Sequence, residues 1–262
     1  MKIVCYARAS HQVEAVGKFT RGLQRHGLTA QLKIPQEPED CDIAVFWGHR
    51  QQGLISRQRS TGKHYLVMER GYIGDRFVWT SLGFDGLNGR AKFPQIDDDW
   101  KRWRTHFDKH MKPWRESKGK TAVIMGQVRS DESVRTVNFE KWVQNIVGSL
   151  RDEAFDVWFR PHPGEPCYRP HEINVMKGSL SEALDAAALV VTYNSNSGVD
   201  AVLAGVPTYA ADPGSMVWCP YTSKIIPINW NRNDWAAKMA YTQWLPEEIE
   251  SGAAWDALRT VI

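Results

Sequence analysis

The sequence predicts an α/β protein made of two successive units, each built on a parallel sheet. Short apolar runs typical of buried strands alternate with segments whose apolar residues recur at helical spacing. This alternation occurs twice, in residues 1–96 and again in residues 120–232. Strands that alternate with helices form parallel sheets that are covered on both faces. Ligands bind such sheets beyond the carboxyl ends of the strands, so the residues at those ends are the candidates for function.

The first unit, residues 1–96, begins with the buried-strand pattern of residues 2–6. In residues 11–26 the apolar side chains recur every three or four positions, and Gly27 is placed to end this helix. The remaining predicted elements are a strand at 29–34, a strand at 42–47, a helix at 52–59 and a strand at 64–69.

Residues 97–119 are charged and rich in tryptophan, which predicts a solvated linker helix between the units. The second unit, residues 120–232, repeats the alternation of strands and helices. Its predicted strands are 121–125, 156–160, 189–192 and 207–210, and its predicted helices are 137–150, 181–187 and 199–204. Residues 233–262 are expected to form C-terminal helices that pack back across the domains.

The composition narrows the class of protein. The longest apolar run falls far short of the roughly 18–20 residues that span a membrane, so no integral membrane segment is expected. The first residues lack the apolar stretch of a signal peptide, and the 4 cysteines include no C-x-x-C pair. These features predict a cytoplasmic protein without a zinc site. The net charge of +3 suits an anionic partner but does not select one.

The most informative segment, residues 190–214, follows a buried strand with small and polar residues and then opens a helix. Those residues are Asn194, Ser195, Asn196, Ser197 and Gly198. Because a helix start exposes backbone N–H groups and a partial positive charge, it suits a phosphate or a carboxylate. Asp200 falls in the first turn of this helix. The structural alternative is an ordinary N-cap formed by serine or asparagine.

Three further segments place polar residues after predicted strands. In 159–165, prolines on both sides of His162 fix the backbone around its imidazole, which can donate to an anionic group. In 125–133, Gln127 and Ser133 lie in a turn between a strand and a helix. The stretch 68–93 gathers acidic and basic residues among glycines, and it is alternatively a simple hairpin excursion.

These segments resemble, in the same order, the motifs of the capsule-polysaccharide-biosynthesis family of glycosyltransferases, which includes bacterial Kdo transferases. The matching stretches are ERGY at 69–72, GLNG at 86–89, Gly126-Gln127 with Asp131 and Ser133, Pro161-His162-Pro163, and the T-x-x-S-x-x-G-x-D-A-type segment at 192–207.

The resemblance implies a GT-B type fold, in which two Rossmann-like parallel-sheet domains face a cleft. It implies that residues 120–232 bind a nucleotide-sugar donor, UDP- or CMP-linked, and that residues 1–96 lie on the acceptor side. It also implies no obligatory metal and no cofactor, since the donor is a substrate. Asp97-Asp98-Asp99 contains a D-x-D pattern, but we interpret it as a helix start. The residues expected to hold the donor are Gln127, Ser133, Arg160, His162, Asn194, Ser195, Ser197, Gly198 and Asp200.

Glycosyl transfer needs a base that removes the proton of the acceptor hydroxyl. In the family, an acidic residue of a Glu-Asp-Gly-Phe type motif is the expected base, and Arg70 occupies the place of its aspartate here. We therefore expect Glu69 to be the base, with Asp75 and then His49 as alternatives. Arg70 or Arg76 would instead neutralise an anionic donor or acceptor.

The sequence is compatible with several hypotheses about function. The first is transfer to a glycan or glycoconjugate, which the family suggests. The second is a bacteriophage-type DNA-modification enzyme that glycosylates hydroxymethylated pyrimidines, with the basic stretch 101–120 and scattered arginines following the phosphate backbone. A third is a non-catalytic nucleotide- or DNA-binding module, which Arg70 would favour. A sugar-nucleotide epimerase on the same fold is a further alternative.

Overall fold

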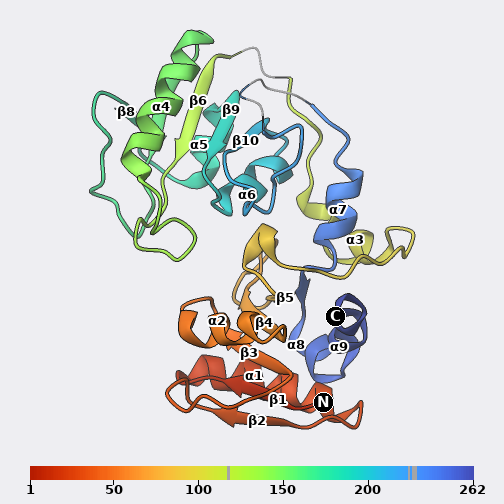
Figure 1. Ribbon diagram of the computed structural model, residues 1–262. Helices are drawn as coiled ribbons and strands as arrows, with labels where there is room; N and C mark the ends of the chain where they lie inside the picture. Colours follow the sequence, from red (N-terminus) through yellow and green to blue (C-terminus); the bar gives the residue numbers. More distant parts are fainter. Residues whose placement is uncertain (117–118, 224, 226–228) are drawn as a thin grey trace. The chain divides into compact units, whose positions relative to one another are not determined.

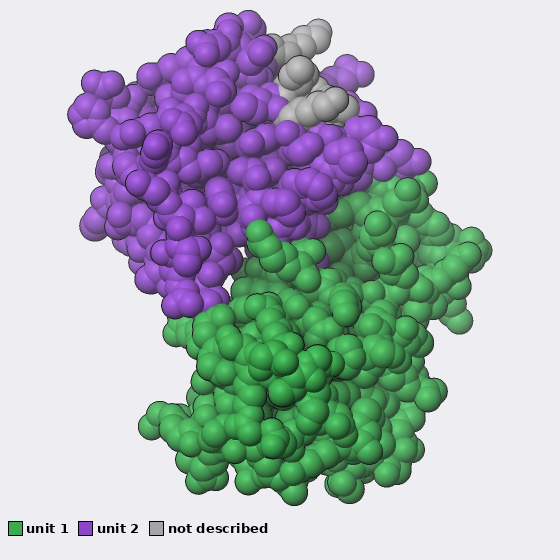
Figure 2. Space-filling view, viewed as in Figure 1, with its two compact units in different colours: residues 1–107, 232–262 green, residues 108–231 purple. Residues whose placement is uncertain are grey.

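The computed structural model describes residues 1–116, 119–223, 225 and 229–262, and it divides into two compact units (Figure 2). Unit 1 comprises Met1–Phe107 and Arg232–Ile262, and unit 2 comprises Asp108–Asn231. The predicted linker 97–119 thus contributes to both units. Its residues 117–118, and residues 224 and 226–228 of the predicted second domain, lie outside the described residues.

Unit 1 combines the N-terminal elements with the C-terminal end of the chain (Figure 1). Its strands are β1 (Ile3–Tyr6), β2 (Ala30–Lys33), β3 (Ile43–Trp47), β4 (His64–Arg70), β5 (Thr80–Phe84) and β11 (Gln243–Trp244). Its helices are α1 (Ser10–Gln24), α2 (Gln52–Ser60), η1 (Asn88–Arg90), α3 (Lys101–His106), α7 (Asn233–Met239), α8 (Pro246–Glu250), α9 (Ala253–Leu258) and η3 (Arg259–Val261).

The sheet of unit 1 has the strand order β11-β5-β4-β3-β1-β2, and β1 to β4 are parallel. Side chains alternate between its faces. One face packs on α2 through a cluster that includes Phe46, Ile55 and Tyr65. The opposite face carries Cys5, whose thiol bonds to Thr20 of α1, and burial raises the pKa of this thiol to about 12.

Two strands of unit 1 were not among the predicted strands, although the hairpin alternative for residues 68–93 matches the first of them, β5. β5 follows β4 through a hairpin and pairs with it antiparallel, so the expected all-parallel pattern ends at β4. β11 then adds to β5 from a stretch that the sequence analysis took as helical. Gln243 explains this strand, because its side-chain oxygen accepts from the N–H groups of Tyr72 (2.6 Å) and Ile73 (3.0 Å). A long-range contact of this kind leaves no periodic signal in the sequence.

The predicted solvated helix of the linker is also different in the structure. Trp103 of α3 and the following Phe107 are fully buried in unit 1, although charged residues surround them in the sequence. Trp103 contacts Trp235 of α7, with ring centroids 6.1 Å apart. The spacing of four residues places both aromatic rings on one face of the helix, so α3 belongs to a core.

Unit 2 has the strands β6 (Thr121–Met125), β7 (Asp156–Arg160), β8 (Asn174–Val175), β9 (Leu189–Thr192) and β10 (Thr208–Ala210). Its helices are η2 (Asp108–His110), α4 (Phe139–Asp152), α5 (Leu180–Ala186) and α6 (Ser197–Leu203). The sheet order is β10-β9-β6-β7-β8, and every printed pairing is parallel. This is the predicted parallel sheet of the second unit.

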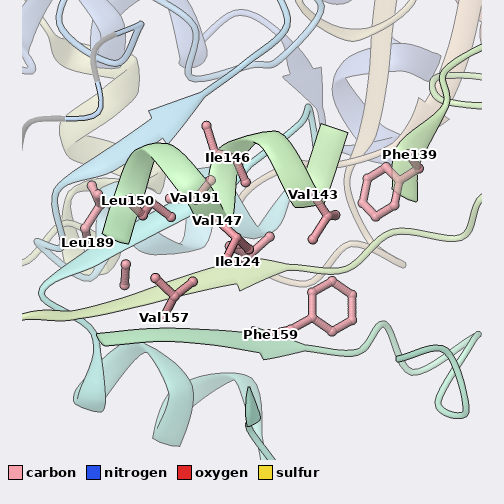
Figure 3. Close-up of a cluster of buried hydrophobic side chains, with 11 residues drawn as sticks. Ile124, Phe139, Val143, Ile146, Val147, Leu150, Val157, Phe159, Leu189 and Val191 are labelled. Atoms are coloured by element: carbon pink, nitrogen blue, oxygen red, sulfur yellow. The ribbon is translucent and has the colours of Figure 1, made fainter. Parts of the chain in front are cut away.

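Helices cover both faces of the sheet of unit 2. Figure 3 shows Val143, Val147 and Leu150 of α4 lying over side chains of β6, β7 and β9. The other face of β6 packs on α5 and α6, through residues that include Leu184 and Ala201. The motif segments therefore extend from the carboxyl ends of buried strands, which fix their starting points. None of the described helices has the length and apolar character that crossing a membrane requires.

Candidate functional site

Most of the polar residues predicted in the second unit follow the carboxyl ends of three neighbouring strands. Gly126 and Gln127 follow β6, His162 lies just beyond β7, and Asn194 follows β9. Arg160 is the last residue of β7. Because β9, β6 and β7 are adjacent and parallel, these residues lie at one edge of the sheet.

Gly126 allows the loops after β6 and β7 to meet. Its N–H donates to the carbonyl of Arg160 at 2.8 Å. A Cβ at this position would lie 2.9 Å from both the Arg160 oxygen and the His162 nitrogen. Any larger residue would therefore push two strand ends apart, and the glycine joins the Gly-Gln motif directly to the Pro-His-Pro motif.

Gln127 and Asn194 form a reciprocal amide pair. The Gln127 Nε2 donates to Asn194 Oδ1 at 2.8 Å, and the Asn194 backbone N–H donates to Gln127 Oε1 at 3.0 Å. The two residues are 7% and 5% exposed, so these bonds lie away from water and are costly to break. Both residues were predicted to hold a ligand, and in the structure their amides hold two loops together.

Asn194 connects two more segments. Its Nδ2 donates to the backbone oxygen of Ser133 at 3.0 Å and to Asp212 Oδ2 at 2.9 Å. Asp212 lies beyond β10, is 6% exposed, and also accepts from the N–H of Gly214 at 3.1 Å. Asp212 was not predicted as a site residue, because it stands alone in the Ala-Asp-Pro-Gly turn that follows the 192–207 motif.

The loop between β9 and α6 uses its backbone donors internally. The N–H of Ser195 donates to Thr192 Oγ1 at 2.8 Å, and the N–H of Ser197 donates to Ser195 Oγ at 3.3 Å. The N–H of Gly198 donates to the Ser195 carbonyl at 3.1 Å. The helix-start argument made from the sequence expected open N–H groups here, and in this conformation local bonds occupy them.

The Ser197 hydroxyl differs from these backbone groups. Its Oγ is buried and has no hydrogen-bond partner among the described residues. A buried hydroxyl without a partner costs free energy, and a ligand that bonds to it would remove that cost. Asp200 follows one turn later on α6, half-buried. Ser197 is therefore the residue of this loop that is best prepared to contact a ligand.

Arg160 carries a second buried polar atom of this kind. Its Nε has no partner among the described residues, and its side chain forms no ion pair with them. Phe159 points toward α4, so Arg160 lies on the opposite face of the sheet. Burial lowers the pKa of the Arg160 guanidinium, which nevertheless stays protonated near neutral pH. A partly desolvated cation without an acidic partner is suited to an anionic ligand.

His162 has a defined tautomer in this loop. Its Nδ1 accepts the backbone N–H of Gly164 at 2.9 Å. In the neutral imidazole the proton must then be on Nε2, which becomes a hydrogen-bond donor. The edge of the unit 2 sheet thus offers an imidazole N–H, a guanidinium and a hydroxyl, which together can bind a phosphate or carboxylate group.

In unit 1, Glu69 and His49 lie at the carboxyl edge of the sheet. The Glu69 Oε1 is 4.0 Å from the position that a Cβ of Gly48 would take, immediately after β3. His49 is the next residue, and its ring centroid lies 5.9 Å from that of Tyr65. The structure therefore places two of the three residues predicted as alternative bases at the same edge of the sheet.

The third, Asp75, lies in the exposed loop between β4 and β5. Its Oδ1 accepts the N–H of Phe77 at 2.9 Å, and its carbonyl accepts from Val78 at 3.0 Å and Trp79 at 3.1 Å. Asp75 thereby orders its own turn. This contact gives Asp75 a local structural role.

The two N-terminal motifs also meet in unit 1. The Tyr72 hydroxyl donates to Asn88 Oδ1 at 3.1 Å, and Ser81 Oγ donates to the Tyr72 oxygen at 3.2 Å. Burial raises the pKa of Tyr72, and the nearby Glu69 carboxylate acts in the same direction. Tyr72 is therefore a neutral phenol that ties the ERGY and GLNG stretches together beside Glu69.

The Asp97–Asp99 run has a structural role as well. Asp98 Oδ2 accepts the backbone N–H of Arg102 at 2.7 Å and the Tyr241 hydroxyl at 2.8 Å. Burial opposes ionisation of Asp98, but these hydrogen bonds outweigh it and lower its pKa. Asp98 therefore caps α3, as the helix-start interpretation expects. Within the described part of the chain, no cluster of three His, Cys, Asp or Glu side chains could hold a metal ion.

Comparison with solved structures identifies the fold. The beta Kdo 2,7 transferase of Thermosulfurimonas dismutans KpsC matches with a TM-score of 0.56 and 15% identity, covering 98% of this chain and 100% of its own. The beta Kdo 2,4 transferase of the same KpsC matches with a TM-score of 0.53 and 15% identity, covering 80% and 79%. Both are transferases of the kind that the motifs resemble. At this identity the likeness establishes a shared fold, and it confirms the predicted GT-B type architecture of two Rossmann-like units.

The sequence itself adds no family assignment. A scan against protein-family models found no match, and a search of curated proteins found no significant match.

Proposed function

We propose that this protein is a glycosyltransferase. It binds a UDP- or CMP-linked sugar at the carboxyl edge of the unit 2 sheet and transfers the sugar to a hydroxyl group of a glycan or glycoconjugate. The fold shared with two Kdo transferases supports glycosyl transfer as the reaction class. We further propose that the nucleotide sugar is a substrate, that no resident cofactor or metal takes part, and that the reaction is cytoplasmic.

One observation carries the proposal. The loops that follow β6, β9 and β10 are fixed to one another through Asn194, which bonds to Gln127, Ser133 and Asp212. We call this set of buried hydrogen bonds among Gln127, Ser133, Asn194 and Asp212 the bracket. A buried polar cluster of this kind does not stabilise a domain better than apolar packing would. Its effect is to hold loops rigidly at the place where open α/β sheets bind ligands.

The groups that face a ligand in this account belong to Ser197, Arg160 and His162, which take no part in the bonds of the bracket. The Ser197 Oγ and the Arg160 Nε lack partners among the described residues. The Nε2 of His162 carries the proton in the neutral ring, because Nδ1 accepts from Gly164. Positive charge and N–H donors stabilise the phosphate that leaves when the bond between sugar and nucleotide breaks. Gln127 and Asn194 then act as positioning residues.

Unit 1 supplies the base. Glu69 takes the proton of the acceptor hydroxyl, whose oxygen forms the new bond to the sugar as the nucleotide departs with the electrons of the broken bond. Glu69 is favoured because it lies at the strand edge beside Gly48, whereas the Asp75 carboxylate orders its own loop. A general base of this kind contributes roughly 100- to 10,000-fold in rate.

Two of the arginines that suggested a DNA acceptor have contacts within unit 1. Arg57 pairs with Asp40 at 2.7 Å, and Arg59 donates to the Tyr65 hydroxyl at 2.6 Å. No feature of the described residues favours DNA over a glycan, so the glycan is the acceptor that we propose. The experiment that tests the proposal includes hydroxymethylated DNA as the alternative acceptor.

The experiment measures nucleotide release from a panel of UDP- and CMP-sugars. Each donor is incubated with the protein alone, with a neutral or an acidic glycan, and with plain or hydroxymethylated DNA. Release that depends on one donor and rises with a glycan supports the proposal, and EDTA should leave the rate unchanged. Release stimulated by hydroxymethylated DNA would mean that DNA, and not a glycan, is the acceptor. No release and no binding with any donor would favour the non-catalytic module.

A further inference from the structure

Arg70 is the residue at which this chain departs from the motif that it resembles, and the structure places it in an unusual setting. It is the last residue of β4 and is half-buried. Its guanidinium carbon lies 4.5 Å from the ring centroid of Phe77 and 5.7 Å from that of Trp47. Both distances are within the range of cation–π attraction, so two aromatic rings hold the guanidinium.

The guanidinium N–H groups of Arg70 have no hydrogen-bond or ion-pair partner among the described residues. The other arginines that stack on rings in the described part of the chain all have such partners. Those partners are the Tyr65 hydroxyl for Arg59, Glu248 for Arg102 and Glu165 for Arg129. Arg70 is therefore a positioned cation whose planar set of donors is not used by the fold.

The two rings are themselves held in place. Trp47 ends β3, and His11 of α1 meets it edge-on with ring centroids 5.5 Å apart. Phe77 is fixed through its backbone, because its N–H donates to Asp75 Oδ1. The Phe77 side chain is nevertheless 79% exposed, so it contributes little to a core. Its ring lies against the Arg70 guanidinium.

The position of Arg70 relates it to the proposed base. Successive residues of a strand point to opposite faces of the sheet, so Glu69 and Arg70 project from opposite faces at the carboxyl end of β4. An acceptor whose hydroxyl reaches Glu69 would therefore lie at the same strand end as Arg70. The planar guanidinium matches the two oxygens of a carboxylate or a phosphate in a bidentate arrangement.

We propose that Arg70 is a specificity-determining residue that binds an oxyanion of the acceptor, a carboxylate or a phosphate, and so selects an acidic acceptor. This inference rests on the proposed function, because it takes unit 1 as the acceptor side. Trp47 and Phe77 act as positioning residues that restrict the rotation of the guanidinium before the acceptor arrives, which lowers the entropy lost on binding.

The test observes the guanidinium directly. In ¹⁵N-labelled protein, the Nε–Hε signal of Arg70 is assigned by its loss in Arg70→Lys, and methyl α-glucuronide and methyl α-glucoside are titrated at equal ionic strength. The two sugars differ in one group, because the glucuronide carries a carboxylate where the glucoside carries a hydroxymethyl group. The Arg70 signal should shift saturably with the glucuronide and not with the glucoside. Arg70→Gln should weaken glucuronide binding about tenfold or more, since charge-assisted bonds are lost.

Arg59→Lys is the matched control, because Arg59 also lies over a ring, at 5.3 Å from the centroid of Tyr65, but donates to its hydroxyl. This variant should keep the preference for the glucuronide. An Arg70 signal that does not move, or that moves equally with both sugars, would overturn the proposal. A shift caused by UDP or CMP instead would also overturn it, by assigning the guanidinium to the donor.

The two proposals fail in different ways. Loss of nucleotide binding with an intact response of Arg70 to the sugar acid would remove the donor site and keep the anion site. Nucleotide binding without a response of Arg70 would do the opposite.

Discussion

Gln127 and Asn194 hold each other through two hydrogen bonds, at 2.8 and 3.0 Å, although 67 residues separate them in the sequence. The pair links the loop after β6 to the loop after β9. Because Asn194 also bonds to Ser133 and Asp212, a third loop is fixed at the same point. The two motifs that look like ligand-binding sequences thus bond to each other and hold the loops of the candidate site together.

The first prediction concerns this bracket. Asn194→Ala should lower the free energy of unfolding by about 2–3 kcal/mol, because it leaves the buried Gln127 Nε2 without its acceptor and removes one of the donors to Asp212 Oδ2. A double-mutant cycle with Gln127→Ala should give a coupling energy of at least about 0.5 kcal/mol, measured by urea unfolding. Asn145→Ala, on the exposed side of α4, is the control and should change stability little. Additive effects of the two substitutions would show that the bracket is not one unit.

Gly126 is the subject of the second prediction. Gly126→Ala should destabilise unit 2 by about 1–3 kcal/mol, because the new methyl group meets the backbone of Arg160 and His162 at 2.9 Å. Gly148→Ala in α4 is matched to it, since nothing lies within 4 Å of its added carbon, and should stabilise by about 0.5–1 kcal/mol. Thermal unfolding of both variants measures the contrast. Equal effects at the two positions would contradict the close approach at Gly126.

These positions also show what the sequence could predict. The two α/β units, most strands and the motif loops follow from periodicity and from glycine and proline signals. β11 could not be predicted, because it depends on the distant contacts of Gln243 with Tyr72 and Ile73. Trp103 was assigned to a solvated helix because charged neighbours hide its spacing from Phe107.

For the site, the sequence pointed to residues but not to what they do. Gln127 and Asn194 were expected to bind a ligand, whereas in the folded protein they bond to each other. Asp212 carries no motif and became visible through its bond to Asn194. The isolation of the Arg160 and Ser197 polar atoms likewise depends on packing and has no signal in the sequence.

The third prediction is a pH dependence. Arg102 binds the Glu248 carboxylate with Nη1 and Nη2, the latter at 2.9 Å. Burial pushes the pKa of Glu248 upward, but the bonds from Arg102 outweigh it and hold that pKa below its ordinary value of 4.5. A carboxylate with a lowered pKa stabilises the fold above pH 4.5 and loses this effect as the pH falls through its folded pKa.

Glu248→Gln should therefore cost about 3 kcal/mol at pH 7, since one member of a largely buried pair is removed, and the difference from the parent protein should shrink below pH 4. Urea unfolding at several pH values measures it. Glu250→Gln, which breaks an exposed pair with Arg21, should have little effect at any pH. A Glu248→Gln deficit that persists unchanged at low pH would disprove the electrostatic origin.

The fourth prediction tests the base. Glu69→Gln should lower kcat at least about 100-fold with little change in the KM of the donor, because the amide cannot accept the proton of the acceptor. Asp75→Asn keeps an oxygen for the N–H of Phe77 and should retain most of the turnover. Near-normal turnover in Glu69→Gln would move the role to His49 or Asp75.

The account depends most on the claim that the carboxyl edge of the unit 2 sheet binds the nucleotide of a sugar donor. The direct measurement is thermal unfolding of the parent protein, His162→Ala and Ser197→Ala with UDP, CMP, GDP and their sugar conjugates. A nucleotide at 100 times its Kd should stabilise the parent protein by about 2.7 kcal/mol. Both variants should fold normally and lose most of this increase at the same ligand concentration. An increase that survives in both variants, or its absence in the parent protein with every nucleotide, would contradict the claim.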